Sequence, residues 1–335
     1  MSSSCRSDEL YMRRALQLAK NGLGNVSPNP MVGAVIVASN GKIIGEGWHR
    51  KFGGPHAEVN ACNSVADSDK DLIKESTIYV TLEPCSHHGK TPPCTDLLLR
   101  ERFKRVVIGS SDPFHRVNGN GINRLREAGI DVTVGVLEKE CRELNRKFFT
   151  AHTIRRPYVT LKWAQSIDSW MDSRVDHPHK FSTSTGQTLV HRLRAENDCI
   201  ITSTKTILAD DPRMNNRLWK GLKSPEIVVL GSSELNCEEL RIFRKSNPIV
   251  ISQNKSLEEI LTDLYEQYGF ISALVEAGPT LLNSFIKSGL WDEARVEVSP
   301  IRLNETGKSR APEGLPAPSN VMKIDSNQIY FYQNV

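Results

Sequence analysis

Short apolar runs alternate with helix-type patterns along the whole chain, and this alternation limits the fold more than any other feature. Runs rich in β-branched residues, such as 77–82 and 226–230, predict strands. The apolar spacing within 120–128 and 256–268 predicts helices. Chains in which strands and helices alternate fold as helices packed on sheets. The sequence therefore predicts an α/β sheet in each half.

The length of the chain predicts two domains. It has 335 residues, whereas a single hydrophobic core rarely grows beyond about 250–300 residues. A polar, basic stretch at 152–157, HTIRRP, separates a long helix predicted over 137–149 from a strand predicted over 158–163. We place the domain boundary in this region, which gives domains over 1–150 and 151–335.

Composition is typical of a soluble globular protein, with 39% hydrophobic and 24% charged residues. The net charge of +4 is small and the basic residues are scattered, so a nucleic-acid partner is not expected. No segment approaches the roughly 18 consecutive apolar residues of a membrane span. The N-terminus also lacks the apolar core of a signal peptide. We therefore expect a cytoplasmic protein that does not bind a membrane.

The strongest chemical signal joins His56, Glu58, Cys85 and Cys94. The two cysteines are the only closely spaced pair among seven, and in a reducing cytoplasm such a pair is more often a metal site than a disulfide. One imidazole and two thiolates suit Zn²⁺ better than Mg²⁺ or Ca²⁺, and three ligands leave a tetrahedral position open for water. Glu58, two residues after His56, is placed to move the protons of that water.

Each part of this pattern is weak by itself, since a His-x-Glu triplet is common by chance and two cysteines could be core thiols. Here the triplet opens a helix predicted over 56–65, and Cys85 follows the strand predicted over 77–82. The joint occurrence favours an open catalytic site over a closed structural one. The order H-x-E and then paired cysteines is typical of zinc nucleobase deaminases, although eight residues, 86–93, separate the cysteines here.

Six stretches resemble the bifunctional riboflavin-biosynthesis deaminase/reductase family, also called RibD or RibG. Those of the first half are SPNPMVGAVIV (27–37), GGPHAEVNA (53–61) and TLEPCSHHGKTPPC (81–94). Those of the second half are LKWAQSID (161–168), HRLRAENDCIITSTKTILADDP (191–212) and VEAGPTLLNSFIKSGLWDE (275–293). The resemblance implies a cytidine-deaminase-like three-layer α/β/α domain followed by a dihydrofolate-reductase-like α/β domain.

For the first domain, the resemblance implies that zinc hydroxide deaminates 2,5-diamino-6-ribosylamino-4(3H)-pyrimidinone 5′-phosphate. It makes His56, Cys85 and Cys94 the metal ligands and Glu58 the catalytic proton carrier. It also places four residues in contact with the substrate: Asn29, His49, His87 and Lys90. A lysine and an imidazole beside a phosphate form charge-assisted hydrogen bonds.

For the second domain, the resemblance implies that NADPH reduces the ribosyl group to a ribityl chain. Lys162 matches a catalytic lysine near the substrate ribose. Seven residues match cofactor contacts: Ala164, Thr206, Asp210, Ser232, Gly278, Pro279 and Thr280. Four residues match substrate contacts: Arg194, Met214, Arg217 and Glu276.

One departure leaves an alternative open. The family motif SLDG reads SIDS at 166–169, so the chain could be a deaminase whose second domain has lost reductase activity. A nucleic-acid-editing deaminase is a further alternative, which the small net charge and the lack of an aromatic-basic RNA motif disfavour. The expected partners are small-molecule substrates, Zn²⁺ and NADPH, together with further copies of the chain in a homo-oligomer.

Overall fold

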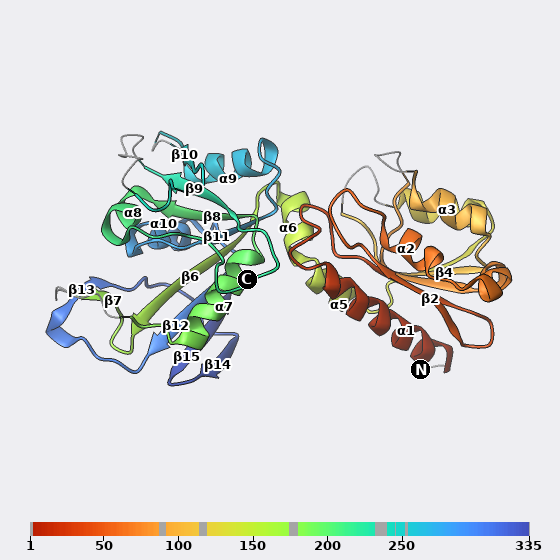
Figure 1. Cartoon of the computed structure of the whole chain (residues 1–335), viewed down its shortest axis with the longest axis horizontal. Helices are drawn as coiled ribbons and strands as arrows, with labels where there is room; N and C mark the ends of the chain where they lie inside the picture. The colour runs from red at the N-terminus through yellow and green to blue at the C-terminus, as the bar shows by residue number, and fades with distance from the viewer. Residues whose placement is uncertain are drawn as a thin grey trace. The chain divides into compact units, whose positions relative to one another are not determined.

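The computed structural model describes residues 3–86, 92–113, 119–173, 180–231, 240–244, 246–251 and 254–334. The chain forms two compact units, Met1–Ile154 and Arg155–Val335, whose elements are labelled in Figure 1. The boundary expected after residue 150 falls inside helix α6 (Arg146–Ile154). Among the helices that the structure describes, none is long and apolar enough to cross a membrane.

The first unit is built on a five-stranded sheet in the order β2-β1-β3-β4-β5. Its strands are β1 (Gly33–Val37), β2 (Ile43–Trp48), β3 (Thr77–Leu82), β4 (Arg105–Ser110) and β5 (Asp131–Val134). β1 is antiparallel to β2 and β3, whereas β3, β4 and β5 are parallel. Gly41 turns the chain between β1 and β2 with φ of 82°, a left-handed backbone that glycine adopts without strain.

Helices cover both faces of this sheet. One face carries α2 (Ala57–Asn63), the 3₁₀ helix η2 (Asp67–Glu75), α3 (Cys94–Glu101) and α4 (Asn120–Glu127). The other carries α1 (Ser3–Ala19), which continues into the 3₁₀ helix η1 (Lys20–Gly22), and α5 (Glu138–Leu144). Figure 1 shows α1 and α5 on one side and α2 and α3 on the other. The three-layer α/β/α arrangement predicted for this half is confirmed.

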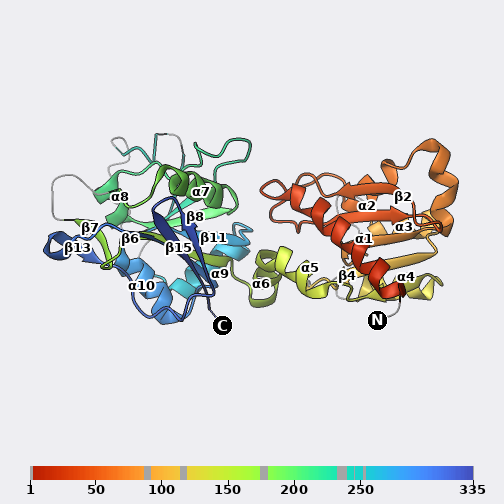
Figure 2. The same cartoon turned by 90° about the horizontal axis from the view of Figure 1, so that it is seen from below.

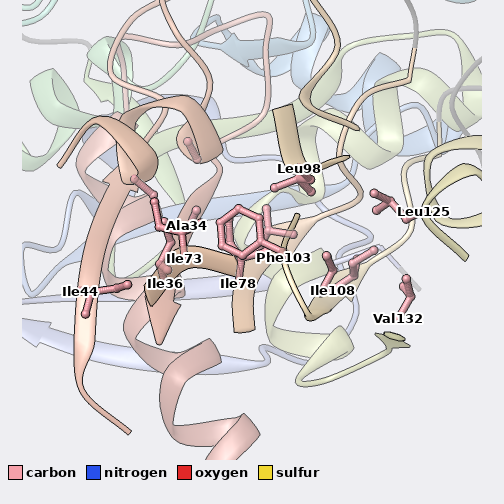
Figure 3. Packing of buried hydrophobic residues seen from close by; sticks show 14 of the residues in the cluster. Ala34, Ile36, Ile44, Ile73, Ile78, Leu98, Phe103, Ile108, Leu125 and Val132 are labelled. Atoms are coloured by element: carbon pink, nitrogen blue, oxygen red, sulfur yellow. The ribbon is translucent and has the colours of Figure 1, made fainter. Parts of the chain in front are cut away.

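The hydrophobic core follows the alternation of side chains along the strands. Ile36 and Ile78 pack with the α2–α4 side, as Figure 3 shows. Val35 and Tyr79, one residue before or after them, pack with α1 and α5. Each central strand is therefore buried on both faces, which is why these strands read as continuous apolar runs.

The single helix predicted over 137–149 is wrong. The chain forms two helices there, α5 and α6, and Asn145 lies between them with φ of −108°. The helical spacing of apolar residues continues through the break, from Leu137 to Phe148, and therefore hides it. The Asn145 side chain instead pairs with the backbone of Met31, and asparagine favours such breaks because its amide competes with helical hydrogen bonds.

The second unit is built on an eight-stranded sheet in the order β10-β9-β8-β11-β6-β12-β15-β14. Its strands are β6 (Tyr158–Ser166), β8 (Cys199–Ser203), β9 (Glu226–Leu230), β10 (Ile249–Ile251), β11 (Ser272–Val275), β12 (Glu293–Ser299), β14 (Asn320–Ile324) and β15 (Asn327–Gln333). Neighbours from β10 to β12 are parallel, and β15 and β14 add antiparallel pairs at one edge. β7 (Trp170–Ser173) and β13 (Gly307–Arg310), which follows the 3₁₀ helix η3 (Asn304–Thr306), form a separate ribbon.

Helices also cover both faces of the second sheet. α7 (Ser184–Ala195) and α8 (Thr204–Asp210) lie on one side, and α9 (Leu257–Glu266) and α10 (Pro279–Ser288) on the other, as Figure 2 shows. On β8, Ile200 packs toward α7 and α8 while Ile201 packs toward α9 and α10. The α/β sheet predicted for this half is confirmed.

The sequence patterns do not predict β5, β7, β13, β14 and β15. β5, β7, β13 and β14 are short strands of four or five residues. β15 is longer and lies between β12 and β14, but most of its residues are only partly buried or exposed. Their pairing therefore depends on the neighbouring strand rather than on a strong apolar alternation of their own.

Candidate active sites

The three predicted metal ligands converge on one point of the first unit. Cys85 follows β3, His56 is the N-cap of α2 and Cys94 opens α3. His56 Nδ1 lies 3.3 Å from Cys94 Sγ and 3.6 Å from Cys85 Sγ, and the three ligand atoms lie within 4.8 Å of one another. The Cys94 N–H donates to Cys85 Sγ at 3.3 Å. Two helix starts and one strand end thus bring together side chains from distant parts of the sequence.

These atoms fit a zinc ion. With Zn–S bonds of about 2.3 Å and Zn–N bonds of about 2.0–2.1 Å, tetrahedral geometry separates a sulfur ligand from a nitrogen ligand by about 3.5 Å. The separations of 3.3 and 3.6 Å fall on either side of that value. His56 Nδ1 is the ring nitrogen that faces the sulfurs, so His56 would coordinate through Nδ1 and carry its proton on Nε2. Three ligands leave one tetrahedral position open.

The two thiols differ in acidity. A hydrogen bond from the Cys94 thiol lowers the pKa of Cys85, against the opposing effect of burial. The same hydrogen bond, together with burial, holds the pKa of Cys94 above its usual value. The proximity of the two sulfurs therefore favours loss of the first proton and opposes loss of the second, which metal binding has to displace.

Glu58 is buried beside these ligands. It is the second residue of α2, and 3% of its surface is exposed. Burial raises the pKa of Glu58, and the nearby His56 imidazole opposes this effect. The Cys94 side chain lies close enough to the Glu58 carboxylate to affect the pKa of both groups. A carboxylate in this environment can hold and release a proton next to the metal ligands.

Two of the four predicted contacts to the pyrimidine substrate lie together in the same unit. Asn29 Nδ2 is 3.2 Å from His49 Nε2, and His49 Nδ1 is 3.0 Å from the carbonyl oxygen of Pro55. The His49 ring stands edge-on to the His56 ring, with centroids 5.4 Å apart. Burial lowers the pKa of His49, so the neutral ring donates from Nδ1 and accepts at Nε2. The other two predicted contacts lie outside the described residues: His87 and Lys90.

Asn145 belongs to this site although the sequence analysis does not predict it. Its Oδ1 accepts the N–H of Met31 at 2.8 Å, and its Nδ2 donates to the carbonyl oxygen of Met31 at 2.9 Å. Met31 lies two residues after Asn29, so this pair of bonds holds the segment that carries a predicted substrate contact. The only local signal is an asparagine, a poor helix former, in the middle of a predicted helix.

In the second unit the structure brings together three of the predicted substrate contacts. Arg194 Nε and Nη2 donate to the two carboxylate oxygens of Glu276 at 2.6 and 2.7 Å. Arg194 Nη2 also lies 3.9 Å from Met214 Sδ. The Arg194 and Glu276 side chains are 13% and 11% exposed. Burial acts to raise the pKa of Glu276, but Arg194 outweighs it and holds that pKa below its usual value.

An open cleft of about 430 Å³ adjoins this ion pair. Its lining holds four arginines: Arg194, Arg213, Arg217 and Arg241. Asp210 and Asp211 share the lining, and Asp211 pairs with Arg241 at 2.6 Å. Arginine presents a planar set of donors that matches phosphate oxygens. The excess of arginine over acid makes this cleft suitable for a phosphate-bearing molecule.

Lys162 lies on β6 beside this group. Burial lowers the pKa of Lys162, while the carboxylates of Glu276 and Glu297 oppose that effect. A small cavity is lined by Lys162, Arg295 and Glu297. A partly buried amine with two carboxylates nearby can hold a proton at Nζ close to a bound sugar.

The predicted cofactor contacts gather in part around the start of α10. Gly278 is the N-cap of this helix, and Pro279 and Thr280 are its first two residues. The N–H of Gly278 donates to Thr206 Oγ1 at 3.1 Å and so ties α10 to α8. Free N–H groups at a helix start bind phosphate readily.

The remaining predicted cofactor contacts lie elsewhere. Ala164 pairs in register with Glu297 of β12. Asp210 ends α8 and lines the arginine-containing cleft. Burial raises the pKa of Asp210, and Asp172 of β7 adds to the effect. Ser232 lies outside the described residues.

Comparison with known proteins assigns both halves. The model of the cytidine and deoxycytidylate deaminase zinc-binding region matches residues 5–110, and that of the RibD C-terminal domain matches residues 157–331. The riboflavin biosynthesis protein RibD of Aquifex aeolicus is 37% identical, over 96% of this chain and 95% of that protein. The chain belongs to the RibD family. RibD of Escherichia coli is 35% identical over 90% of each chain.

Solved structures of RibD proteins match the whole chain. Acinetobacter baumannii RibD is 31% identical, with a TM-score of 0.90 over 99% of both chains. A Thermotoga maritima protein named as a diaminohydroxyphosphoribosylaminopyrimidine deaminase/5-amino-6-(5-phosphoribosylamino)uracil reductase is 35% identical. Its TM-score is 0.88, over 98% of this chain and 99% of that one. These matches confirm the fold class predicted for both domains.

Membership of the RibD family makes the chain a bifunctional enzyme with a deaminase domain and a reductase domain. Both halves match their family models, so the alternative of a deaminase with a purely structural second domain is not supported. The zinc-binding region and the His56, Cys85 and Cys94 group support Zn²⁺. The RibD reductase domain implies a nicotinamide cofactor.

The departure from the RibD motif SLDG lies in a turn whose backbone conformation favours glycine. Ser169, at the position of the glycine, has φ of 64° in the turn between β6 and β7. Its N–H donates to the Ser166 oxygen at 3.0 Å and its own oxygen accepts the Ala311 N–H at 2.9 Å. Glycine adopts this conformation freely, whereas serine carries a strain of about 1 kcal/mol. Both hydrogen bonds use backbone atoms, so either residue can form them. The serine therefore changes the stability of the turn and not its hydrogen bonds.

Proposed function

We propose that this chain deaminates 2,5-diamino-6-ribosylamino-4(3H)-pyrimidinone 5′-phosphate in its first unit. In its second unit it reduces the ribosyl group of the product to a ribityl chain with NADPH. The observation that carries the proposal is the convergence of His56 Nδ1, Cys85 Sγ and Cys94 Sγ beside the buried carboxylate of Glu58. The name of the Thermotoga maritima relative, which describes both reactions, supports the choice of substrate.

In the deamination, His56, Cys85 and Cys94 hold Zn²⁺. A zinc ion in this setting lowers the pKa of a water molecule and so supplies a nucleophile at neutral pH. Glu58 accepts the proton that the water gives up, and returns protons to the ring nitrogen and to the departing ammonia. Its burial next to Cys94 keeps this exchange away from bulk water.

Two pairs of residues bind the pyrimidine substrate in this proposal. Asn29 and His49 contact the pyrimidine edge, because an amide can both donate and accept hydrogen bonds there. His87 and Lys90 hold the ribose phosphate through charge-assisted bonds. The contact of 3.2 Å between Asn29 Nδ2 and His49 Nε2 supports the first pair.

In the reduction, the nicotinamide cofactor supplies hydride to C1′ of the ribose, and the protein supplies binding and orientation. Lys162 stands at the ribose and stabilises the ring as it opens. The residues that bind the substrate are Arg194, Met214, Arg217 and Glu276, with the arginines facing its phosphate. The residues that bind NADPH are Ala164, Thr206, Asp210, Ser232, Gly278, Pro279 and Thr280.

The experiment is incubation of the zinc-loaded protein with the diaminopyrimidine phosphate, with and without NADPH, followed by mass spectrometry of the products. Without NADPH, we expect one amino group to be replaced by oxygen as water is consumed and ammonia released. With NADPH, we expect the product to gain two further hydrogen atoms. Absence of ammonia would refute the deaminase proposal, and ammonia without NADPH oxidation would refute the reductase proposal. A parallel reaction with NADH tests the preference for NADPH.

We further propose that the chain works as a homo-oligomer in the cytoplasm, with no nucleic-acid or membrane partner. The small net charge of +4 supports the absence of a nucleic-acid partner. Light scattering of the purified protein tests the oligomer, since a mass of 37.5 kDa would identify a monomer.

A further inference from the structure

Glu83 is a buried carboxylate to which the proposed chemistry gives no role. It lies between β3 and Cys85, with 4% of its surface exposed. Its Oε2 accepts the N–H groups of Asp112 at 3.2 Å and Gly119 at 3.1 Å. Its Oε1 accepts those of Gly121 at 2.9 Å and Ile122 at 3.3 Å. Four backbone donors, three of them at the start of α4, therefore bind one carboxylate, and the helix dipole favours the negative charge there.

α4 also packs closely against the backbone of Pro84, the residue before the proposed ligand Cys85. A Cβ atom on Gly121 would lie 2.3 Å from the carbonyl oxygen of Pro84 and 3.2 Å from Glu83 Oε1. The Glu83 N–H donates to the Ser110 oxygen at 2.9 Å, so its backbone is still paired with β4. Cys85 comes two residues later. The carboxylate thus fastens the first turn of α4 to the short segment that positions the Cys85 sulfur.

A second contact connects α4 to both cysteine ligands. Arg124 of α4 donates from Nη1 to Thr95 Oγ1 at 3.2 Å. Thr95 follows Cys94, and its N–H and hydroxyl group donate to the Cys85 carbonyl oxygen at 3.2 and 3.3 Å. A helix that contributes no ligand therefore contacts the side chains of two residues that flank the Cys85–Cys94 pair, Glu83 before it and Thr95 after it.

We propose that Glu83 is a positioning residue for the zinc site, acting together with Arg124 through α4. The inference rests on the proposed role of His56, Cys85 and Cys94 as ligands. Groups that orient the ligands of a metal typically change its affinity about 10–100-fold when they are lost. Without the Glu83 carboxylate, the segment from Pro84 to Cys85 loses its connection to the first turn of α4. The separation of the two sulfurs is then held less firmly, by the contacts of Cys85 with Cys94 and Thr95.

The test compares zinc release to a chelator from the wild-type protein, Glu83→Gln and the matched control Glu127→Gln. Glutamine keeps the size of Glu83 but replaces one accepting oxygen with an amide group that cannot accept the two N–H groups it faces. We expect Glu83→Gln to bind zinc about 10–100-fold more weakly and to alter the absorption spectrum of the cobalt-loaded protein. Glu127 is exposed at the other end of α4, so its variant should match the wild type.

Two outcomes would overturn the proposal. If Glu83→Gln melts at a lower temperature without metal but releases zinc at the wild-type rate, Glu83 only caps the helix. If Glu83→Gln does not fold, Arg124→Gln carries the test, because that side chain is 44% exposed and its loss is better tolerated. Wild-type zinc release from Arg124→Gln would then contradict the proposal. A wild-type protein that binds no zinc would refute the proposed function itself, which separates the two failures.

Discussion

The side-chain amide of Asn145 binds the backbone of Met31 across 114 positions of the sequence, through hydrogen bonds of 2.8 and 2.9 Å. The neighbouring Val32 carbonyl oxygen accepts the N–H of His49 at 2.9 Å. Because Asn29 in turn contacts the His49 ring, one amide at a break between two helices supports both predicted contacts to the pyrimidine.

Replacing Asn145 with aspartate should weaken substrate binding while leaving zinc in place. A carboxylate can accept the Met31 N–H but cannot donate to the Met31 carbonyl oxygen. That partly buried oxygen would lose its partner, at a cost of about 1–3 kcal/mol. We expect the KM of deamination to rise by roughly 5- to 150-fold, with a smaller change in kcat. Steady-state kinetics measures this, with the exposed Asn123→Asp as control. An unchanged KM would show that Asn145 stabilises the fold without positioning the substrate contacts.

Replacing Glu58 with glutamine should abolish deamination without loss of metal. The amide cannot accept the proton of the attacking water, and general acid–base catalysis typically contributes about 10²–10⁴-fold to a rate. Ammonia release measures the activity, and zinc content by elemental analysis checks the site. Near-normal turnover with a full complement of zinc would remove Glu58 from its proposed role.

Replacing Lys162 with methionine should damage reduction and spare deamination. Methionine fills a similar space but lacks the amine. We therefore expect the rate of NADPH oxidation to fall by about 100-fold or more. Ammonia release should stay at the wild-type rate because the two activities belong to separate domains. Lys287→Met, an exposed change on α10, is the matched control. Equal loss of both activities would contradict the assignment.

Replacing Ser169 with glycine should stabilise the second unit. Glycine relieves the left-handed strain at φ of 64°, and part of this gain is offset by the greater freedom of glycine in the unfolded chain. We expect a net gain of up to about 0.6 kcal/mol and a rise in Tm of up to about 2 °C. The control is Ser184→Gly at the start of α7, where helical backbone disfavours glycine and Tm should fall. A lower Tm for Ser169→Gly would contradict the strain at this turn.

The stability of the second unit should fall with acidity between pH 6.5 and 4, and His191 should contribute to that fall. His191 is 4% exposed, and its ring nitrogen accepts the N–H of Leu218 at 3.4 Å. Burial, and then the charges of Arg194 and Arg217, lower its pKa to about 4. The unfolded chain, with a histidine pKa of about 6.5, binds the proton first, so acid favours unfolding in this window.

Thermal unfolding measured at several pH values tests this prediction. His191→Gln keeps an acceptor for Leu218 but does not titrate. Its Tm should therefore fall less than that of the wild type between pH 7 and 5. If the plots of Tm against pH were parallel for the two proteins, His191 would have the same proton affinity in the folded and unfolded chains.

Much of the fold and of the metal site is predictable from local patterns. β3 and α10 form where the sequence predicts a strand at 77–82 and a helix at 279–288, because each has a strong apolar pattern and clear boundaries. His56 at a helix start and Cys85 at a strand end were likewise readable, since their positions depend on a few neighbouring residues. The helix predicted over 137–149 failed because apolar spacing continues through Asn145, whose partner Met31 is remote.

The sequence by itself determined the alternation of strands and helices, the two domains and the set of residue types that can hold zinc. Only the tertiary structure decided which of those residues meet. The ion pair of Arg194 and Glu276 spans 82 positions. The contact of Glu83 with Gly121 of α4 spans 38 positions, with α3 and β4 between them. Such contacts depend on the order of strands in the sheets and on the packing of helices across them. Short-range periodicity carries no information about either.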